Sequence, residues 1–210
     1  ISSIKMSLKL LDDDRVGKMN IEQKELVQHI KEDCGRLLKI TSELLDLAQV
    51  ETGNLQLNFV KTDPKKIAIY AMDAVRFQAE QKAIELELIS RNNLPKISVD
   101  IEKTAWVLVN FLSNALRYSA EKSKIVVQVI ENNNVVEFSV RDFGKGIEEQ
   151  YLKRLFDKYF QVPTDGSSKS GSGLGLAISK DFIEAENGNI WVESSIGEGS
   201  KFYFSLPVAD

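Results

Sequence analysis

Apolar residues in the first 50 positions recur at helical spacing. Residues 1–13 carry them three and four apart, and "DDDRVGKMN" is a polar connection. A longer seam from Ile21 to about Val50 keeps this spacing through Val27, Ile30, Cys34, Leu37, Thr41, Leu44 and Ala48. Such a seam is typical of packed helices. The pattern predicts an antiparallel helical hairpin over residues 1–53. Because two helices cannot bury both their faces alone, a second copy is expected to complete a dimeric four-helix bundle.

Strand and helix patterns alternate over residues 54–210. "ETGNLQLN" predicts a linker or short strand, and Thr62 or Asp63 caps a helix whose apolar stripe is Ile67, Tyr70, Ala71, Ala74 and Phe77. "AIELELIS" predicts a strand, while "SKIVVQVIENNNVVEFSVRD" and "NIWVESSIGEGSKFYFSLP" predict hairpins. "VDIEKTAWVLVNFLSNALRYS", "EEQYLKRLF" and "LGLAISKDFIEAEN" predict helices, the last closed by Gly188. The fold class is therefore α+β: the hairpin followed by an α/β sandwich with helices on one face of a mixed sheet.

Composition narrows the functional classes. The 210 residues are 43% hydrophobic and 28% charged, as in a soluble globular protein, and the net charge of −4 argues against nucleic acid as a partner. Apolar runs stay shorter than the ~18 residues of a membrane span. The single cysteine, Cys34, lies on the helical seam and is expected to be buried and structural. Because the chain opens in an amphipathic pattern without a cap residue, we expect it to be a piece of a longer protein.

Two asparagines occupy one face of the apolar helix that contains "NFLSNALRYS". Asn110 and Asn114 are four residues apart, and Arg117 and Tyr118 continue their face one turn later. A carboxamide in such a helix must be hydrogen-bonded or coordinate a cation. An Asn oxygen suits Mg²⁺, which takes phosphate oxygens as further ligands, and Arg117 could then meet phosphate directly. The alternative is that the asparagines form hydrogen bonds across a helix contact.

A predicted strand ends at Asp142 in "VRDFGKGI", where Gly144 and Gly146 allow a sharp turn. An ionised carboxylate only accepts hydrogen bonds. At a strand end it could accept one from the exocyclic amine of adenine, which guanine lacks at that position. An ordinary Asp-x-Gly turn is the alternative.

Glycines alternate at the mouth of a helix in "SGSGLGLAISK". They are Gly171, Gly173 and Gly175. Backbone N–H groups and the helix dipole favour anions at such a place, and glycine lets phosphate oxygens come close. Leu174 and Leu176 are expected to anchor the segment in the core. The Gly/Ser stretch from Gly166 onward predicts a lid that orders on binding, with a plain flexible linker as the alternative.

The order of these motifs resembles the catalytic core of bacterial sensor histidine kinases. The Asn box is "NFLSNALRYS", the first glycine box "DFGKGI", the Phe box "LFDKYF" and the second glycine box "GSGLGLAISK". The closing "GNIWVESSIGEGSKFYFSLP" also matches, and the resemblance extends over the helical hairpin. It implies a dimerisation hairpin over residues 1–53 and, over residues 54–210, an ATP-binding domain of the gyrase, chaperone and histidine-kinase type.

The resemblance also implies roles for individual residues. ATP and Mg²⁺ are the implied cofactors, with Asn114 and Asn110 at the metal and Arg117 and Tyr118 facing the phosphates. Asp142 would bind the adenine amine beside a wall shaped by Gly144, Gly146 and Ile147. Lys158 and Phe160 would lie near the nucleotide. The triphosphate would be lined by Gly171, Ser172, Gly173, Leu174, Gly175 and Leu176.

Two positions depart from the family pattern. Gln161 stands where the family often has Arg, so that a γ-phosphate contact is either missing or supplied by Lys158 or Lys169. The family's phosphoacceptor His sits in the first helix before an acidic residue, and it is expected upstream of Ile1. The only histidine present, His29, falls on the solvent side of the helical seam and is expected to be an ordinary surface residue.

The leading functional hypothesis is an ATP-dependent protein-histidine kinase core that passes phosphate from a His to an aspartate of a response regulator. The expected location is the cytoplasmic part of a membrane-anchored sensor, with any membrane segment elsewhere in the protein. One alternative is an ATP-driven clamp, which needs an acidic base near the first Asn of its box; Glu102 and Glu121 flank the helix but miss that face. The other alternative is a degenerate kinase that serves as a dimeric scaffold.

Overall fold

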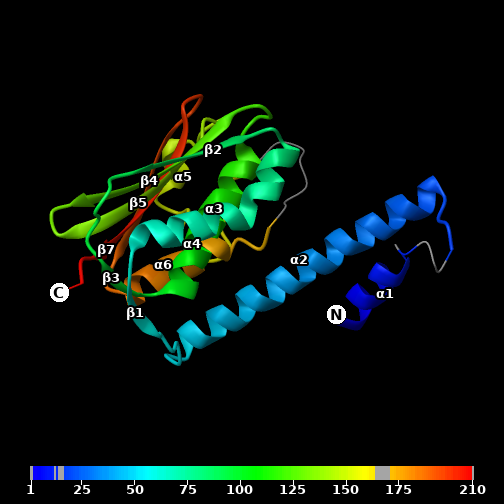
Figure 1. Ribbon diagram of the computed structural model, residues 1–210, viewed down its shortest axis with the longest axis horizontal. Coiled ribbons are helices and arrows are strands. Elements are labelled where there is room, and N and C mark those ends of the chain that lie inside the picture. Colours follow the sequence, from blue (N-terminus) through cyan, green and yellow to red (C-terminus); the bar gives the residue numbers. More distant parts are fainter. Residues whose placement is uncertain (1, 12, 14–16, 164–170, 210) are drawn as a thin grey trace. The chain divides into compact units, whose positions relative to one another are not determined.

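The computed structural model describes the chain except residues 1, 12, 14–16, 164–170 and 210, and it divides into two compact units. The first, Ile1–Asn54, contains helices α1 (Ser2–Leu11) and α2 (Ile21–Glu51) (Figure 1). The second, Leu55–Asp210, contains the remaining helices and strands. The two helical segments predicted for the first 50 residues are confirmed.

Helix α2 starts at a reciprocal cap. The Asn20 side chain accepts a hydrogen bond from the Gln23 amide at 2.8 Å, and the Gln23 side chain accepts one from the Asn20 amide at 2.9 Å. Leu8 of α1 packs against Val27 and Cys34 of α2, which confirms that Cys34 is buried. Five of the seven residues of the predicted seam are exposed within the chain: Ile30, Leu37, Thr41, Leu44 and Ala48.

The second unit is built on a mixed five-stranded sheet in the order β2-β4-β5-β7-β6, in which only the β2–β4 pair is parallel. Its strands are β2 (Glu85–Ser90), β4 (Lys124–Asn132), β5 (Val135–Arg141), β6 (Asn189–Ser195) and β7 (Gly199–Pro207). A separate antiparallel pair joins β1 (Phe59–Thr62) to β3 (Ile97–Asp100), a strand that the sequence pattern did not predict.

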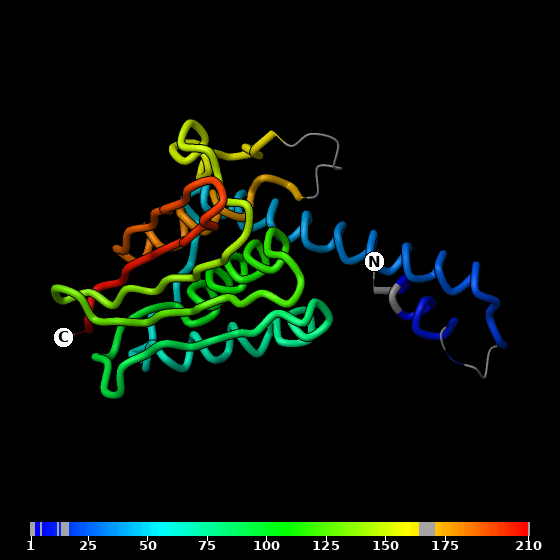
Figure 2. Tube along the Cα trace, turned by 90° about the horizontal axis from the view of Figure 1, so that it is seen from above, coloured from blue at the N-terminus to red at the C-terminus, as the bar shows by residue number. Residues whose placement is uncertain are grey.

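One face of the sheet is covered by helices (Figure 2). They are α3 (Pro64–Gln81), α4 (Ile101–Tyr118) and α6 (Gly175–Ala185); α5 (Glu149–Leu152) is a single turn. Phe111 of α4 packs against Phe202 and Phe204 of β7, and Phe204 stacks on Phe138 of β5 at 4.6 Å. The predicted sandwich is confirmed. No helix in the described part of the chain has the length and apolar character needed to cross a bilayer.

Two local predictions were wrong. On α3 the aromatic side chains face outward, with Tyr70 65% and Phe77 69% exposed, and Ala74 is exposed as well. The buried stripe is instead Ile67, Ala68, Ala71, Val75 and Ala79, because small side chains allow α3 to approach its neighbours closely.

The second wrong prediction concerns the end of α6. Asn187, with φ +60°, takes the left-handed position that Gly188 was expected to hold. Gly188 is required for a different reason: a Cβ there would lie 2.3 Å from the Ser205 carbonyl oxygen.

Candidate functional site

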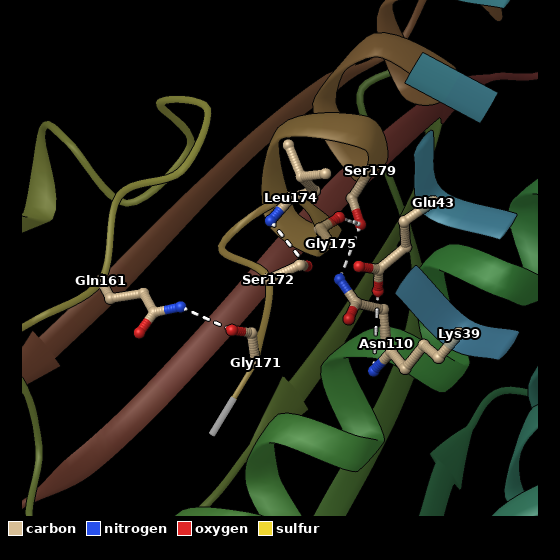
Figure 3. Close-up of polar contacts among 9 residues, drawn as sticks. All are labelled: Lys39, Glu43, Asn110, Gln161, Gly171, Ser172, Leu174, Gly175 and Ser179. Atoms are coloured by element: carbon tan, nitrogen blue, oxygen red, sulfur yellow. Dashed lines mark hydrogen bonds and ion pairs between the residues drawn. The ribbon is translucent and has the colours of Figure 1, made fainter. Parts of the chain in front are cut away.

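The Asn110 side chain lies between α4 and the start of α6. It is 7% exposed, and its Nδ2 donates to the Ser179 hydroxyl at 3.0 Å, which in turn donates to the Gly175 carbonyl at 2.8 Å (Figure 3). Among the described residues no hydrogen bond reaches Oδ1, which lies 2.7 Å from the point where a Cβ of residue 175 would be. The alternative of a cross-helix hydrogen bond is therefore correct for Nδ2, while Oδ1 keeps its acceptor capacity.

The C-terminal half of α4 contacts both glycine segments. Asn114, one turn beyond Asn110, is half-buried, and within the described residues its side chain has no hydrogen bond. The Arg117 Nη1 lies 3.2 Å from the point where a Cβ of Gly171 would be. The Tyr118 carbonyl oxygen lies 2.5 Å from the corresponding point of Gly144, so that any larger residue at 144 would collide with the backbone.

Asp142 directly follows the last residue of β5, and the residue is only 4% exposed. Its Oδ1 accepts hydrogen bonds from the Gly144 amide at 2.9 Å and the Ser200 amide at 3.2 Å. Burial raises the pKa of Asp142, and these two amides and the nearby Arg141 charge oppose that rise. No hydrogen bond within the described chain ends on Oδ2, so this oxygen is left as an acceptor.

The turn that follows Asp142 is pressed against the tip of the β6–β7 hairpin. Gly146 has φ +72°, and a Cβ there would lie 1.9 Å from the Ser195 carbonyl oxygen. The Ile147 amide donates to the Ser194 hydroxyl at 2.8 Å. Sequence reasoning missed Ser194 and Ser200; the serines on either side of "SIGEG" were the available signal, but nothing in their spacing shows that the hairpin tip meets this turn.

The second glycine segment is tied to the chain that precedes it. The Tyr159 amide donates to the Gly173 carbonyl at 2.9 Å, and the Gln161 side chain donates to the Gly171 carbonyl at 2.8 Å (Figure 3). Gly173 has φ +73°, and a Cβ there would lie 2.8 Å from the Tyr159 backbone. Gln161, a departure from the family pattern, therefore supports this segment.

Helix α6 opens without a side-chain cap. Leu174 occupies the cap position and is fully buried, which confirms its predicted anchoring role, whereas Leu176 is half-buried. The Ser172 hydroxyl accepts a hydrogen bond from the Leu174 amide at 3.1 Å. Because the side chain of Leu174 cannot accept a hydrogen bond, the first backbone amides of α6 are not capped by it and can donate to an anion.

Other predicted residues are exposed or pack locally. Lys158 is exposed, and the Phe160 ring packs locally, 6.1 Å from the Tyr151 ring and 4.4 Å beneath the Arg154 guanidinium. Lys169 and the stretch from Gly166 to Ser170 lie outside the described residues. Glu102 and Glu121, the candidate bases of a clamp, are both exposed at the two ends of α4.

Comparison with known protein families assigns both units. Residues 99–210 match the model of histidine kinase-, DNA gyrase B- and HSP90-like ATPases, and residues 1–53 match the His Kinase A (phospho-acceptor) domain. The chain belongs to this ATPase family. Its combination of the two domains is that of a two-component sensor kinase core, as the order of the sequence motifs predicted.

Individual relatives agree with this assignment. The chain is 33% identical over 187 residues to the sensor histidine kinase ZraS of Escherichia coli K12, a match that covers 89% of this chain and 38% of ZraS. Full-length ShkA, solved in complex with AMPPNP, matches with a TM-score of 0.80 and 26% identity over 97% of this chain and 42% of ShkA.

A third relative shares the fold at lower identity. Histidine kinase ThkA, in complex with response regulator protein TrrA, matches with a TM-score of 0.72 and 21% identity, over 99% of this chain and 57% of that one. The chain spans between 22% and 47% of the length of the curated relatives it matches.

Proposed function

We propose that this chain is the ATP-dependent protein-histidine kinase core of a two-component signalling system. The second unit binds MgATP, the γ-phosphoryl group passes to a histidine outside these 210 residues, and an aspartate of a response regulator then receives it. One observation carries the proposal: α4 places Asn110 against Gly175, Arg117 beside Gly171 and the Tyr118 carbonyl against Gly144. Glycines from two separate segments of the sequence thereby contact the same stretch of α4, residues 110–118.

Adenine would be recognised by Asp142. Two backbone amides already bind Oδ1, which fixes the carboxyl plane and leaves Oδ2 for the exocyclic amine. The close approach of Gly144 to the Tyr118 carbonyl gives the base a flat wall of backbone on this side.

The phosphates would lie at the mouth of α6. Here the amides of Gly173, Gly175 and Leu176 and the helix dipole favour negative charge, and the neighbouring Arg117 guanidinium adds a cation. Gln161 is uncharged and cannot form an ion pair with the γ-phosphate. Its hydrogen bond to the Gly171 carbonyl instead supports the glycine backbone that would contact the phosphates.

The asparagine oxygens fit a hard cation. Asn110 Oδ1 has no hydrogen bond within the described chain, and Asn114 follows it one turn later on the same helix. These neutral oxygen donors suit Mg²⁺, which when bound would join the phosphate oxygens and neutralise their charge. Ser179 holds the amide of Asn110 so that Nδ2 faces the protein and Oδ1 is left for this ligand.

The hairpin would supply the dimer and the regulator contact. Ile30, Leu37 and Leu44 of the α2 seam are exposed within one chain, and burying them against a second copy would complete a four-helix bundle. The complex of ThkA with TrrA supports a receiver domain as the second partner. We place this core on the cytoplasmic side of a sensor whose membrane anchor belongs to other segments.

Titration calorimetry with ATP, with and without Mg²⁺, tests the nucleotide site directly. Wild-type protein should bind ATP more tightly with Mg²⁺, and Asp142→Ala should abolish binding without unfolding the chain. Transfer is tested in trans, by adding a partner chain that carries the family's phosphoacceptor histidine and following γ-phosphate.

His29 provides the internal control for that transfer assay. It is exposed on α2, and we expect no acid-labile phosphate on it in the 210-residue chain. Labelling of His29, or uptake of ATP that is indifferent to Asp142→Ala, would contradict the proposed function.

A further inference from the structure

We propose that Ser194 is a positioning residue that fixes the adenine wall, Asp142–Ile147, against the β6–β7 hairpin and thereby sets the preference for adenine. The inference rests on the proposed function, because it concerns the wall that would hold the base. Ser194 lies in the closing stretch that resembles the family, but the resemblance implies no role for it; the inference comes from its own hydrogen bonds.

The wall has little internal support. Within residues 142–147 the one hydrogen bond is that from the Gly144 amide to Asp142 Oδ1, and Gly146 adopts a left-handed φ of +72°. A segment without regular structure takes its shape from what it packs against. For this turn the neighbour is the hairpin tip between β6 and β7.

Contacts at the Asp142 end of the wall are made by backbone. The Asp142 amide donates to the Ser200 carbonyl at 2.9 Å, and the Ser200 amide donates back to Oδ1 at 3.2 Å. Gly199 approaches so closely that a Cβ there would lie 2.2 Å from the Asp142 carbonyl oxygen. These contacts hold the carboxyl group but not the far end of the turn.

The far end depends on Ser194. Its hydroxyl accepts from the Ile147 amide at 2.8 Å and donates to the Gly199 carbonyl at 2.8 Å. The Ser200 hydroxyl, 3.0 Å away, can donate to the remaining lone pair. A serine hydroxyl has one proton and two acceptor sites, so all of its capacity is used here.

Only one other hydrogen bond links this far end to the hairpin tip: the Gly197 amide donates to the Lys145 carbonyl at 2.8 Å. Removing the Ser194 hydroxyl takes away the partner of the Ile147 amide and one hydrogen bond from the Gly199 carbonyl. Since Gly199 also touches Asp142, the loss loosens both ends of the wall while the carboxylate itself stays in place.

Base selection supplies the test, with Ser194→Ala compared with Ser195→Ala in the 210-residue chain. Ser195 is the adjacent, exposed serine, whose side chain has no hydrogen bond in the described structure. The probes are ATP and inosine triphosphate, which carries a carbonyl in place of the exocyclic amine. We expect wild type and Ser195→Ala to prefer ATP, and Ser194→Ala to lose about tenfold of that preference, the factor that one buried hydrogen bond supports.

The outcomes separate the two proposals. If wild type binds ATP but Ser194→Ala keeps the same ratio of ATP to inosine triphosphate affinity, even with both weakened, Ser194 is merely structural and the inference is overturned. If wild type does not bind ATP, the proposed function fails first.

Hydrogen exchange at the Ile147 amide gives a second readout without nucleotide. It should be faster in Ser194→Ala and unchanged in Ser195→Ala, with thermal unfolding used to confirm that both variants fold. Equal protection of Ile147 in wild type and Ser194→Ala also overturns the inference.

Discussion

Replacing Glu186 by glutamine is expected to stabilise the second unit at pH 8 and to change its stability little at pH 4.5. Glu186 is 1% exposed where α6 ends, and its Oε1 accepts a hydrogen bond from the Asp100 amide at 2.7 Å. The Thr104 hydroxyl lies 3.0 Å from Oε2 and 2.9 Å from the Asp100 carbonyl, yet its single proton can serve only one of them. A neutral carboxyl group could donate to Thr104 and satisfy both.

The pKa of Glu186 agrees with that geometry. Burial raises it from the usual 4.5 to about 7, against the opposing hydrogen bonds from the Asp100 amide and the Thr104 hydroxyl. Because the folded state binds the proton more tightly, the free energy of unfolding falls as pH rises from 4.5 to 7. The loss of stability caused by ionising Glu186 is absent below the pKa of the unfolded state and fully present above the pKa of the folded state. At 1.36 kcal/mol per pKa unit it amounts to about 3 kcal/mol.

Urea unfolding of wild type and Glu186→Gln between pH 5 and pH 8 measures this cost. Both tryptophans, Trp106 and Trp191, belong to the second unit, so their fluorescence reports its unfolding. Glutamine keeps the acceptor for the Asp100 amide and carries no charge. The difference in unfolding free energy should therefore grow with pH toward about 3 kcal/mol.

The matched control is Glu184→Gln, an exposed residue beside the end of the same helix, whose ion pair with Lys180 measures 3.8 Å. It should show no comparable pH dependence. A stability difference for Glu186→Gln that stays constant across this range, or the same slope in the control, would refute the reasoning.

Four further predictions concern the nucleotide site and the helices. Because the pKa of Asp142 is raised, ATP affinity should fall in mildly acidic buffer at a pH above that at which an ordinary Asp titrates, and calorimetry at several pH values checks this. Gly175→Ala should weaken ATP binding tenfold or more, since its Cβ would lie 2.7 Å from Asn110 Oδ1. Gly35→Ala has open space around it in α2. It should stabilise that helix by up to about 1 kcal/mol, which melting curves can show. Gln161→Ala should weaken ATP binding, because it removes the hydrogen bond to the Gly171 carbonyl. Equal ATP affinity in wild type and Gln161→Ala would contradict the supporting role of Gln161.

Local structure followed closely from the sequence. Of the two predicted cap residues, Thr62 and Asp63, it is Asp63 that caps α3, through the Lys65 amide at 2.9 Å, and Pro64 lies in the first turn as predicted. The Asn-rich turn between β4 and β5 places Asn133 and Asn134 at positive φ. In these places the residue's own conformational preference decides the backbone, so no knowledge of the neighbours is needed.

Helix faces were less predictable. Tyr70 and Phe77 fit the helical period of an apolar stripe as well as Val75 does, yet they face outward. Periodicity shows that a helix has an apolar side, but alanine-rich helices offer two such sides. Which one is buried depends on how closely the neighbouring helix can approach.

By itself, the sequence determined most of the elements, though not strand β3, together with their order and the residue types that can bind phosphate, a cation and adenine. Only the tertiary structure decided that Asn110 meets Gly175, that Ser194 supports Ile147, and that Glu186 is buried against Thr104. The physical reason is range. Caps, turns and glycine conformations are set within a few residues. These three contacts instead join residues that are 47 positions apart for Ile147 and Ser194, 65 for Asn110 and Gly175, and 82 for Thr104 and Glu186. They exist only once the sheet and helices have packed.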